Sequence, residues 1–154
     1  MATPRQIKRR TFEYYQNKTL QHNENKCCSV IALSVVTGLS FEKAHYACRQ
    51  IGGRVNGQGM YTYKTIRVLA SLGFSVKRIP FNGKSMRTLT IPWGGQYLVT
   101  THGHIIGISE GRVVDWSATT DRLIRPKEMY KVYRTHEPTF KPKHYVSKNN
   151  DIYN

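Results

Sequence analysis

The sequence predicts an α+β fold, with helices first and an antiparallel sheet after them. Apolar residues recur at helical spacing through residues 29–72, and from Phe74 onward short runs alternate as strands do. The dipeptide Glu110-Gly111 separates two of these runs and suits a two-residue hairpin, which makes its strands antiparallel. With 154 residues, 39% of them apolar, the chain is long enough for one domain with its own core.

The segment KCCSVIALSVVTG, residues 26–38, predicts a short loop followed by a buried helix. Its positions after the two cysteines are too uniformly apolar or small for a surface helix, and Gly38 is a natural C-terminal cap. Cys28 then falls at or beside the helix N-terminus, where free N–H groups and the macrodipole stabilise a thiolate. The alternative is that Cys27 and Cys28 are ordinary small residues at a helix entrance.

Two more helices are expected before the sheet. The first covers residues 41–51, is capped by Ser40 and places Cys48 in its buried stripe, which makes Cys48 structural. Glycines then make residues 54–60 a flexible loop of the kind that can border a cleft. The next helix covers residues 61–72, and the side chains expected to face inward are Ile66, Leu69, Ala70 and Leu72.

The strands are expected at residues 74–79, 96–101, 104–109, 112–116 and 129–134, whereas residues 86–93 are ambiguous. If Glu110-Gly111 is the two-residue loop, His104 and Asp115 lie diagonally on the same face of the hairpin. Diagonal neighbours are about 7–8 Å apart at the backbone, within reach of an imidazole and a carboxylate. Such a carboxylate would hold the imidazole in one tautomer. The alternatives are that Asp115 does no more than start the turn after the strand, and that His104 is an ordinary sheet histidine.

Three parts of the chain differ in composition. We expect a basic N-terminal arm over residues 1–24, a folded domain over residues 25–136 and a polar tail over residues 137–154. The aromatic and apolar residues expected to anchor the arm are Phe12, Tyr14, Tyr15 and Leu20. No apolar run approaches ~18 residues, so we expect no signal peptide, no transmembrane helix and no membrane partner.

The charge is strongly positive, with 24 Lys and Arg against 9 Asp and Glu, a net charge of +15. No acidic residue occurs between Glu42 and Glu110. Such a surface attracts an acidic protein or peptide, or nucleic acid, although it can also serve solubility alone. The three cysteines include one adjacent pair and no CxxC, which indicates a reducing, cytoplasmic setting without disulfides.

Three stretches carry a resemblance to a known family: CSVIALSVVTGLSFEKAHYACRQIG, the LGF of residues 72–74, and GQYLVTTHGHIIGISEGRVVDW. Over roughly residues 25–117 the chain resembles small viral and bacterial papain-like cysteine peptidases. The resemblance implies a papain-like catalytic domain over residues 25–136 with Cys28 as nucleophile, His104 as its histidine and Asp115 as the third member. The residue before the nucleophile is often Asp or Asn in that group and is Cys27 here, so either cysteine could react, and His102 ranks behind His104.

The resemblance also implies a mechanism, in which an imidazolium–thiolate pair hydrolyses a peptide or isopeptide bond without a cofactor, in the host cytoplasm if the chain is viral. The Cys28 backbone N–H and an upstream side-chain amide would hold the oxyanion; the candidates for that amide are Gln21, Asn23 and Asn25. Two other functions stay open. One is an inactive papain-like protein whose basic face binds nucleic acid or an acidic host protein. The other is a zinc site formed by Cys27, Cys28, His102 and His104, which adjacent cysteines disfavour.

Overall fold

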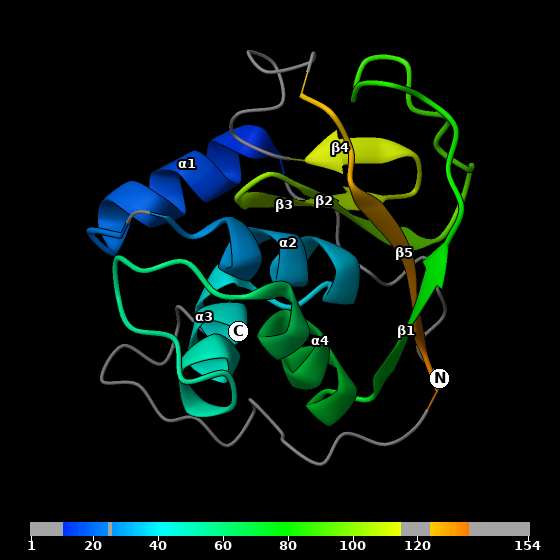
Figure 1. The fold of residues 1–154 in the computed structure, drawn as a ribbon. Helices are drawn as coiled ribbons and strands as arrows, with labels where there is room; N and C mark the ends of the chain where they lie inside the picture. The colour runs from blue at the N-terminus through cyan, green and yellow to red at the C-terminus, as the bar shows by residue number, and fades with distance from the viewer. Residues whose placement is uncertain (1–10, 25, 115–123, 136–154) are drawn as a thin grey trace.

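The computed structural model describes residues 11–24, 26–114 and 124–135, which form a helical layer against one sheet (Figure 1). Within these residues, four helices precede five strands, which confirms the α+β class. The helices are α1 (Phe12–Gln21), α2 (Cys28–Thr37), α3 (Phe41–Gln50) and α4 (Thr62–Ser71). The strands are β1 (Phe74–Ile79), β2 (Gln96–Thr101), β3 (His104–Ser109), β4 (Arg112–Val114) and β5 (Glu128–Arg134), all paired antiparallel in the order β1-β5-β2-β3-β4.

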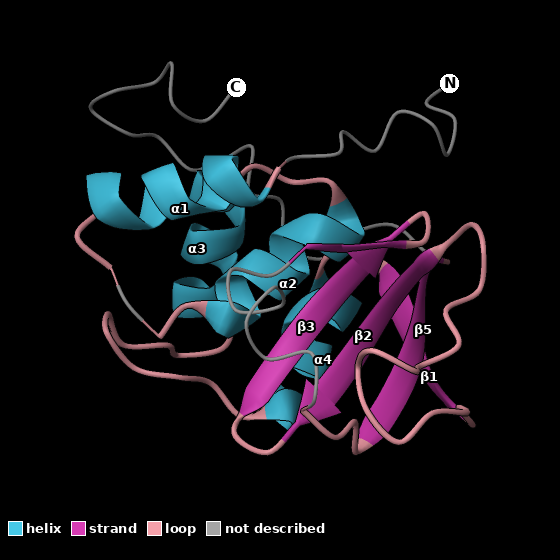
Figure 2. Cartoon of the chain, turned by 90° about the horizontal axis from the view of Figure 1, so that it is seen from above, coloured by secondary structure: helices cyan, strands magenta, loops and turns pink. Residues whose placement is uncertain are grey.

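Helix α2 lies in the middle of the molecule, between the sheet and the other helices (Figures 1 and 2). Its residues from Ser29 to Thr37 are all buried, as expected for a helix that is apolar on every side. The helix ends at Gly38, which has the left-handed φ of 80° that glycine adopts without strain. Helix α3 starts at the predicted cap, because the Ser40 side chain accepts a hydrogen bond from the Lys43 N–H.

A glycine lets α2 pack directly on β3. A Cβ atom at Gly107 would lie 2.9 Å from both the Ala32 carbonyl oxygen and the Val35 Cβ, closer than packed atoms approach. Cys28 is four residues before Ala32, or about 6 Å along the helix axis. His104 is three residues before Gly107, or about 10 Å along the strand. The close contact at Gly107 therefore brings the start of α2 to the start of β3.

The second face of the sheet is covered by the loop between β1 and β2. Leu89 is buried there against the strand residues Tyr97, Val99, Ile106 and Ile108, and Met86 and Ile91 pack against the same cluster. Residues 86–93, whose structure the sequence left ambiguous, form neither helix nor strand and instead close this apolar face. Both faces of the central strands are thus buried, which holds the strand ends near Cys28 in fixed positions.

The predicted hairpin is confirmed residue by residue up to Val114. Ser109 pairs with Arg112, Ile108 with Val113, and Gly107 with Val114. Glu110 and Gly111 both have positive φ, 51° and 78°, as a type I′ turn requires. Asp115 follows directly and lies outside the described residues, as does the predicted tail over residues 137–154.

Two expectations about side-chain burial need correction. Within the expected N-terminal arm, residues 12–21 form helix α1, which is capped by Thr11, whose side chain accepts a hydrogen bond from the Tyr14 N–H. Tyr15 anchors this helix as expected, but Leu20 is 74% exposed. In α4 the fully buried residues are Thr65, Val68 and Leu69, so the inward face lies slightly to one side of the predicted one, and Ala70 is exposed. None of the described helices has the length and apolar character needed to cross a bilayer.

Candidate active site

Cys28 is the first residue of α2 and lines an open cleft of about 580 Å³. One wall of the cleft is the end of the glycine-rich loop, residues 58–62, which the sequence predicted to border a cleft. The other wall consists of strand ends: Thr100 and Thr101 on β2, residues 103–105 at the start of β3, and Lys127 and Glu128 at the start of β5. The buried layers of helix and sheet thus end in a hollow that Cys28 lines.

The structure brings Cys28 and His104 together. Burial by itself would raise the pKa of the Cys28 thiol, but hydrogen bonds from the His104 side chain and the Ile105 backbone, with the positive charge of His104, bring that pKa below its ordinary value of 9.0. The backbone N–H groups in the first turn of α2 form the positive end of the helix dipole. The side chain of the cap residue Cys27 makes no hydrogen bond to them. The thiolate is therefore stabilised from two sides.

The two other cysteines have the opposite environment. Cys27 is 3% exposed and lines a separate pocket between α1 and α2, where burial raises its pKa to about 11. Cys48 is fully buried in α3, and burial raises its pKa to about 12. At neutral pH both are protonated thiols, so the geometry favours Cys28 as the reactive cysteine.

The geometry also separates the two candidate histidines. His104 opens β3, is partly buried and lines the cleft, whereas His102 is exposed in the two-residue turn between β2 and β3. The four residues of the possible zinc site do not converge, since Cys27 lines one pocket, Cys28 another, and His102 neither. Within the described residues, no three or more His, Cys, Asp or Glu side chains are grouped to hold a metal ion.

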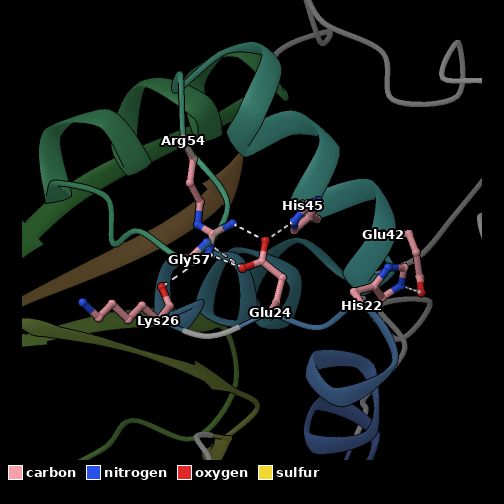
Figure 3. Close-up of polar contacts among 7 residues, drawn as sticks. All are labelled: His22, Glu24, Lys26, Glu42, His45, Arg54 and Gly57. Atoms are coloured by element: carbon pink, nitrogen blue, oxygen red, sulfur yellow. Dashed lines mark hydrogen bonds and ion pairs between the residues drawn. The ribbon is translucent and has the colours of Figure 1, made fainter.

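A buried ion-pair cluster holds the loop that leads to Cys28 (Figure 3). The Glu24 carboxylate receives two hydrogen bonds from the Arg54 guanidinium, at 2.9 and 3.2 Å, and one from the Gly57 N–H at 2.9 Å. The ring of His45 on α3 lies 2.6 Å from the same carboxylate. The side chains of Glu24 and Arg54 are 2% and 0% exposed. One carboxylate thus joins the loop before Cys28, α3 and the loop that forms a wall of the cleft.

The electrostatics of this cluster follow from its burial. Burial alone would raise the pKa of Glu24, but Arg54, His45 and the Gly57 N–H outweigh it and lower that pKa to about 2. For His45 burial wins over the attraction of Glu24, and its pKa is lowered. Asn23 and Lys26, on either side of Glu24, both have positive φ, 51° and 49°, an uncommon conformation for residues other than glycine. The cluster therefore fixes a loop whose backbone is not in its preferred conformation.

A second carboxylate ties α1 to α3. Glu42 lies 2.6 Å from the Lys18 ammonium and 2.9 Å from the His22 ring, and its side chain is 1% exposed. Burial opposes ionisation of Glu42, but the bonds from Lys18 and His22 prevail and lower its pKa. The rings of His22, Phe41 and His45 stack between the two carboxylates, with centroids 5.6 and 5.8 Å apart. No motif in the sequence indicates this cluster, although carboxylates are scarce in a chain of net charge +15.

The candidates for the oxyanion site are placed unequally. Gln21 is the exposed last residue of α1, Asn23 is exposed, and Asn25 lies outside the described residues. Gln58 lines the cleft with Cys28 and has a side-chain amide. Gln58 was not among the candidates predicted from the sequence, although it is a glutamine in the glycine-rich loop of the kind that can border a cleft.

No protein-family model, curated protein or solved structure matches this chain.

Proposed function

We propose that the chain is a papain-like cysteine peptidase or amidase that hydrolyses a peptide or isopeptide bond by thiol acyl transfer. Cys28 is the nucleophile and His104 the general base and acid. The observation that carries the proposal is the contrast among the three cysteines. Cys28 alone lines the cleft beside a histidine and has a lowered pKa, whereas the pKa values of Cys27 and Cys48 are raised.

The reaction has two halves. His104 takes the proton of the Cys28 thiol, and the thiolate attacks the carbonyl carbon of the substrate. The resulting oxyanion lies at the start of α2, where the backbone N–H groups of the first turn have no helical acceptor. The intermediate collapses to a thioester as His104 gives its proton to the leaving amine. A water molecule, deprotonated by His104, then hydrolyses the thioester and regenerates the thiol.

Two further roles belong to the proposal. Asp115, which lies outside the described residues, would orient the His104 ring; the support for this role is the predicted hairpin register, which is observed up to Val114. A side-chain amide would complete the oxyanion site, and Gln58 is the described residue that lines the cleft with such a group. An inactive binding protein on the same scaffold would require neither role.

The test is the pH dependence of alkylation of each cysteine by iodoacetamide, followed by peptide mass spectrometry. Cys28 should react well below pH 8.5, with Cys27 and Cys48 as slow internal references. Replacing His104 with Ala should lower the Cys28 rate at pH 6.5 by roughly tenfold to a hundredfold, because the thiolate fraction falls as the pKa rises. His102→Ala is the matched control and should change the rate less than about twofold. Equal Cys28 rates in the wild type and in His104→Ala would contradict the proposal.

A further inference from the structure

A second pocket adjoins the cleft. It has a volume of about 300 Å³ and is lined by residues 52–55, residues 58–61 and Lys64 of α4. Residues 58–61 also line the cleft that contains Cys28, so the two hollows border the same stretch of loop. A polypeptide bound over Cys28 can therefore continue past Tyr61 into the second pocket. Its volume is at the small end of the range for ligand sites and suits one or two side chains.

Lys64 determines the charge of this pocket. Arg54 also lines it, but the Arg54 guanidinium is paired with Glu24 and its side chain is 0% exposed. Lys64 is partly exposed, and no carboxylate in the described part of the chain pairs with it. No acidic residue lines the pocket among those described. Its charge is therefore positive, located on a side chain that is long enough to follow a ligand.

The neighbouring cleft does not offset this charge. Glu128 is the acidic residue among its described lining residues, and three groups already hold the Glu128 carboxylate: the Tyr130 hydroxyl at 2.8 Å, the Arg78 guanidinium at 3.3 Å and the Thr100 hydroxyl at 3.5 Å. Lys127 lines the same cleft. The described groove thus presents positive charge on both sides of Cys28.

The rim of the second pocket is apolar and exposed. Tyr61 and Val55 are 71% and 65% exposed, and the Tyr61 ring stacks on Tyr63 with centroids 5.9 Å apart and an angle of 14° between the planes. Large exposed apolar side chains beside a charged group suit a ligand with a short aliphatic stem and an anionic end. Glutamate and aspartate side chains have this form.

We propose that Lys64 selects a substrate with an acidic side chain near the scissile bond, bound in the second pocket. The inference rests on the proposed function, because it assigns a substrate preference to the same cleft. Lys64 is a specificity residue and takes no part in the chemistry at Cys28.

The experiment measures how fast peptidyl chloroacetamides alkylate Cys28. Two probes of equal length, one with two Asp residues and one with two Asn residues, are each made with the electrophile at the amino or at the carboxyl end. In one of these orientations the Asp probe should react roughly twofold to fivefold faster at low salt, the range expected for one partly exposed charge pair. The advantage should shrink as the salt concentration rises.

Substitution decides whether Lys64 is responsible. Lys64→Glu should abolish or reverse the preference for the Asp probe, and Lys64→Gln should abolish it without adding a negative charge. Lys84→Glu is the matched control, since Lys84 is exposed in the loop between β1 and β2 and lines neither hollow. It changes the net charge equally and should keep the preference. Alkylation by iodoacetamide should be the same in all four proteins, which shows that Cys28 and His104 are intact.

The outcomes separate the two proposals. Slow, His104-independent alkylation by iodoacetamide would overturn the proposed function. Normal iodoacetamide rates with equal Asp and Asn rates would overturn the acidic subsite alone. A preference that survives Lys64→Glu, or that falls as much in Lys84→Glu, would also overturn it, because the preference would then come from the overall charge of the protein.

Discussion

Cys27 and Cys28 are adjacent at the start of α2, but they line different pockets and their pKa values are shifted in opposite directions. Cys28 lines an open cleft beside His104, and its pKa is lowered. Cys27 lines the pocket between α1 and α2 with Tyr15, Ile31 and Glu24, and burial raises its pKa. Both thiols are near charged groups, since Arg54 lowers the pKa of Cys27 and Glu24 raises it. The difference is that Arg54 and Glu24 neutralise each other, whereas the His104 side chain bonds directly to the Cys28 sulfur.

Single cysteine substitutions give the largest expected effect on this comparison. Cys28→Ala should abolish alkylation below pH 8 and reduce hydrolysis of p-nitrophenyl acetate to the background rate. Cys27→Ala should keep both rates within about threefold, because a thiol with a pKa near 11 is only about one part in ten thousand thiolate at pH 7. Cys48→Ala serves as the buried control. If Cys27→Ala lost as much activity as Cys28→Ala, the assignment of the nucleophile would be wrong.

The sequence predicts the local parts of this arrangement well. Short runs rich in apolar residues and bounded by glycines indicate β2 and β3, Ser40 and Gly38 set helix ends, and Glu110-Gly111 sets the hairpin register. These signals are local, because each depends on neighbouring residues. The pairing of His104 with Cys28 was accessible through chain order and the resemblance, and Asp115 stays a prediction.

The parts that the sequence did not predict depend on contacts between distant residues. In helix α1 the aromatic residue Tyr15 is buried, and its hydroxyl lies 2.9 Å from the Ser34 hydroxyl in α2. Glu24 and Arg54 are thirty residues apart, and periodicity does not relate them. The sequence favoured Cys28 over Cys27 from its place at the helix start, but only the folded chain shows that the two residues line different pockets. The sequence does contain one relevant signal, the scarcity of carboxylates, which marks each one as a candidate for ion pairing.

Breaking the buried pair tests what holds the loop before Cys28, with a smaller expected effect than loss of the Cys28 thiol. Arg54→Met leaves the Glu24 carboxylate buried without its main partner and should lower the free energy of unfolding by about 3–5 kcal/mol. Urea denaturation followed by circular dichroism measures this change. The matched control is Arg78→Met, which removes an arginine paired with Glu128 at the surface, where the side chains are 67% and 33% exposed. That loss should be below about 1 kcal/mol.

The double variant Glu24→Gln/Arg54→Met sharpens the same test. It removes both charges, so it should be more stable than Arg54→Met alone if the unpaired carboxylate causes most of the loss. Equal losses in Arg54→Met and Arg78→Met would show that the cluster does not stabilise the loop before Cys28.

Acid should lower the free energy of unfolding gradually, because protonation of Glu24 weakens the buried cluster beside Cys27. The expected effect is smaller than that of Arg54→Met. The pKa of Glu24 is lowered from 4.5 to about 2, so between these values the unfolded chain binds a proton that the folded protein does not. The stabilisation from Glu24 is therefore complete above about pH 5 and is lost as the pH falls toward 2, by up to about 3 kcal/mol. Urea denaturation at several pH values should show a shallower decline in Glu24→Gln than in the wild type. Glu42, whose pKa is also lowered, leaves an acid-dependent loss in both proteins, so only the difference between them reports on Glu24. Parallel declines would mean that the Glu24 carboxylate is not held as the structure shows.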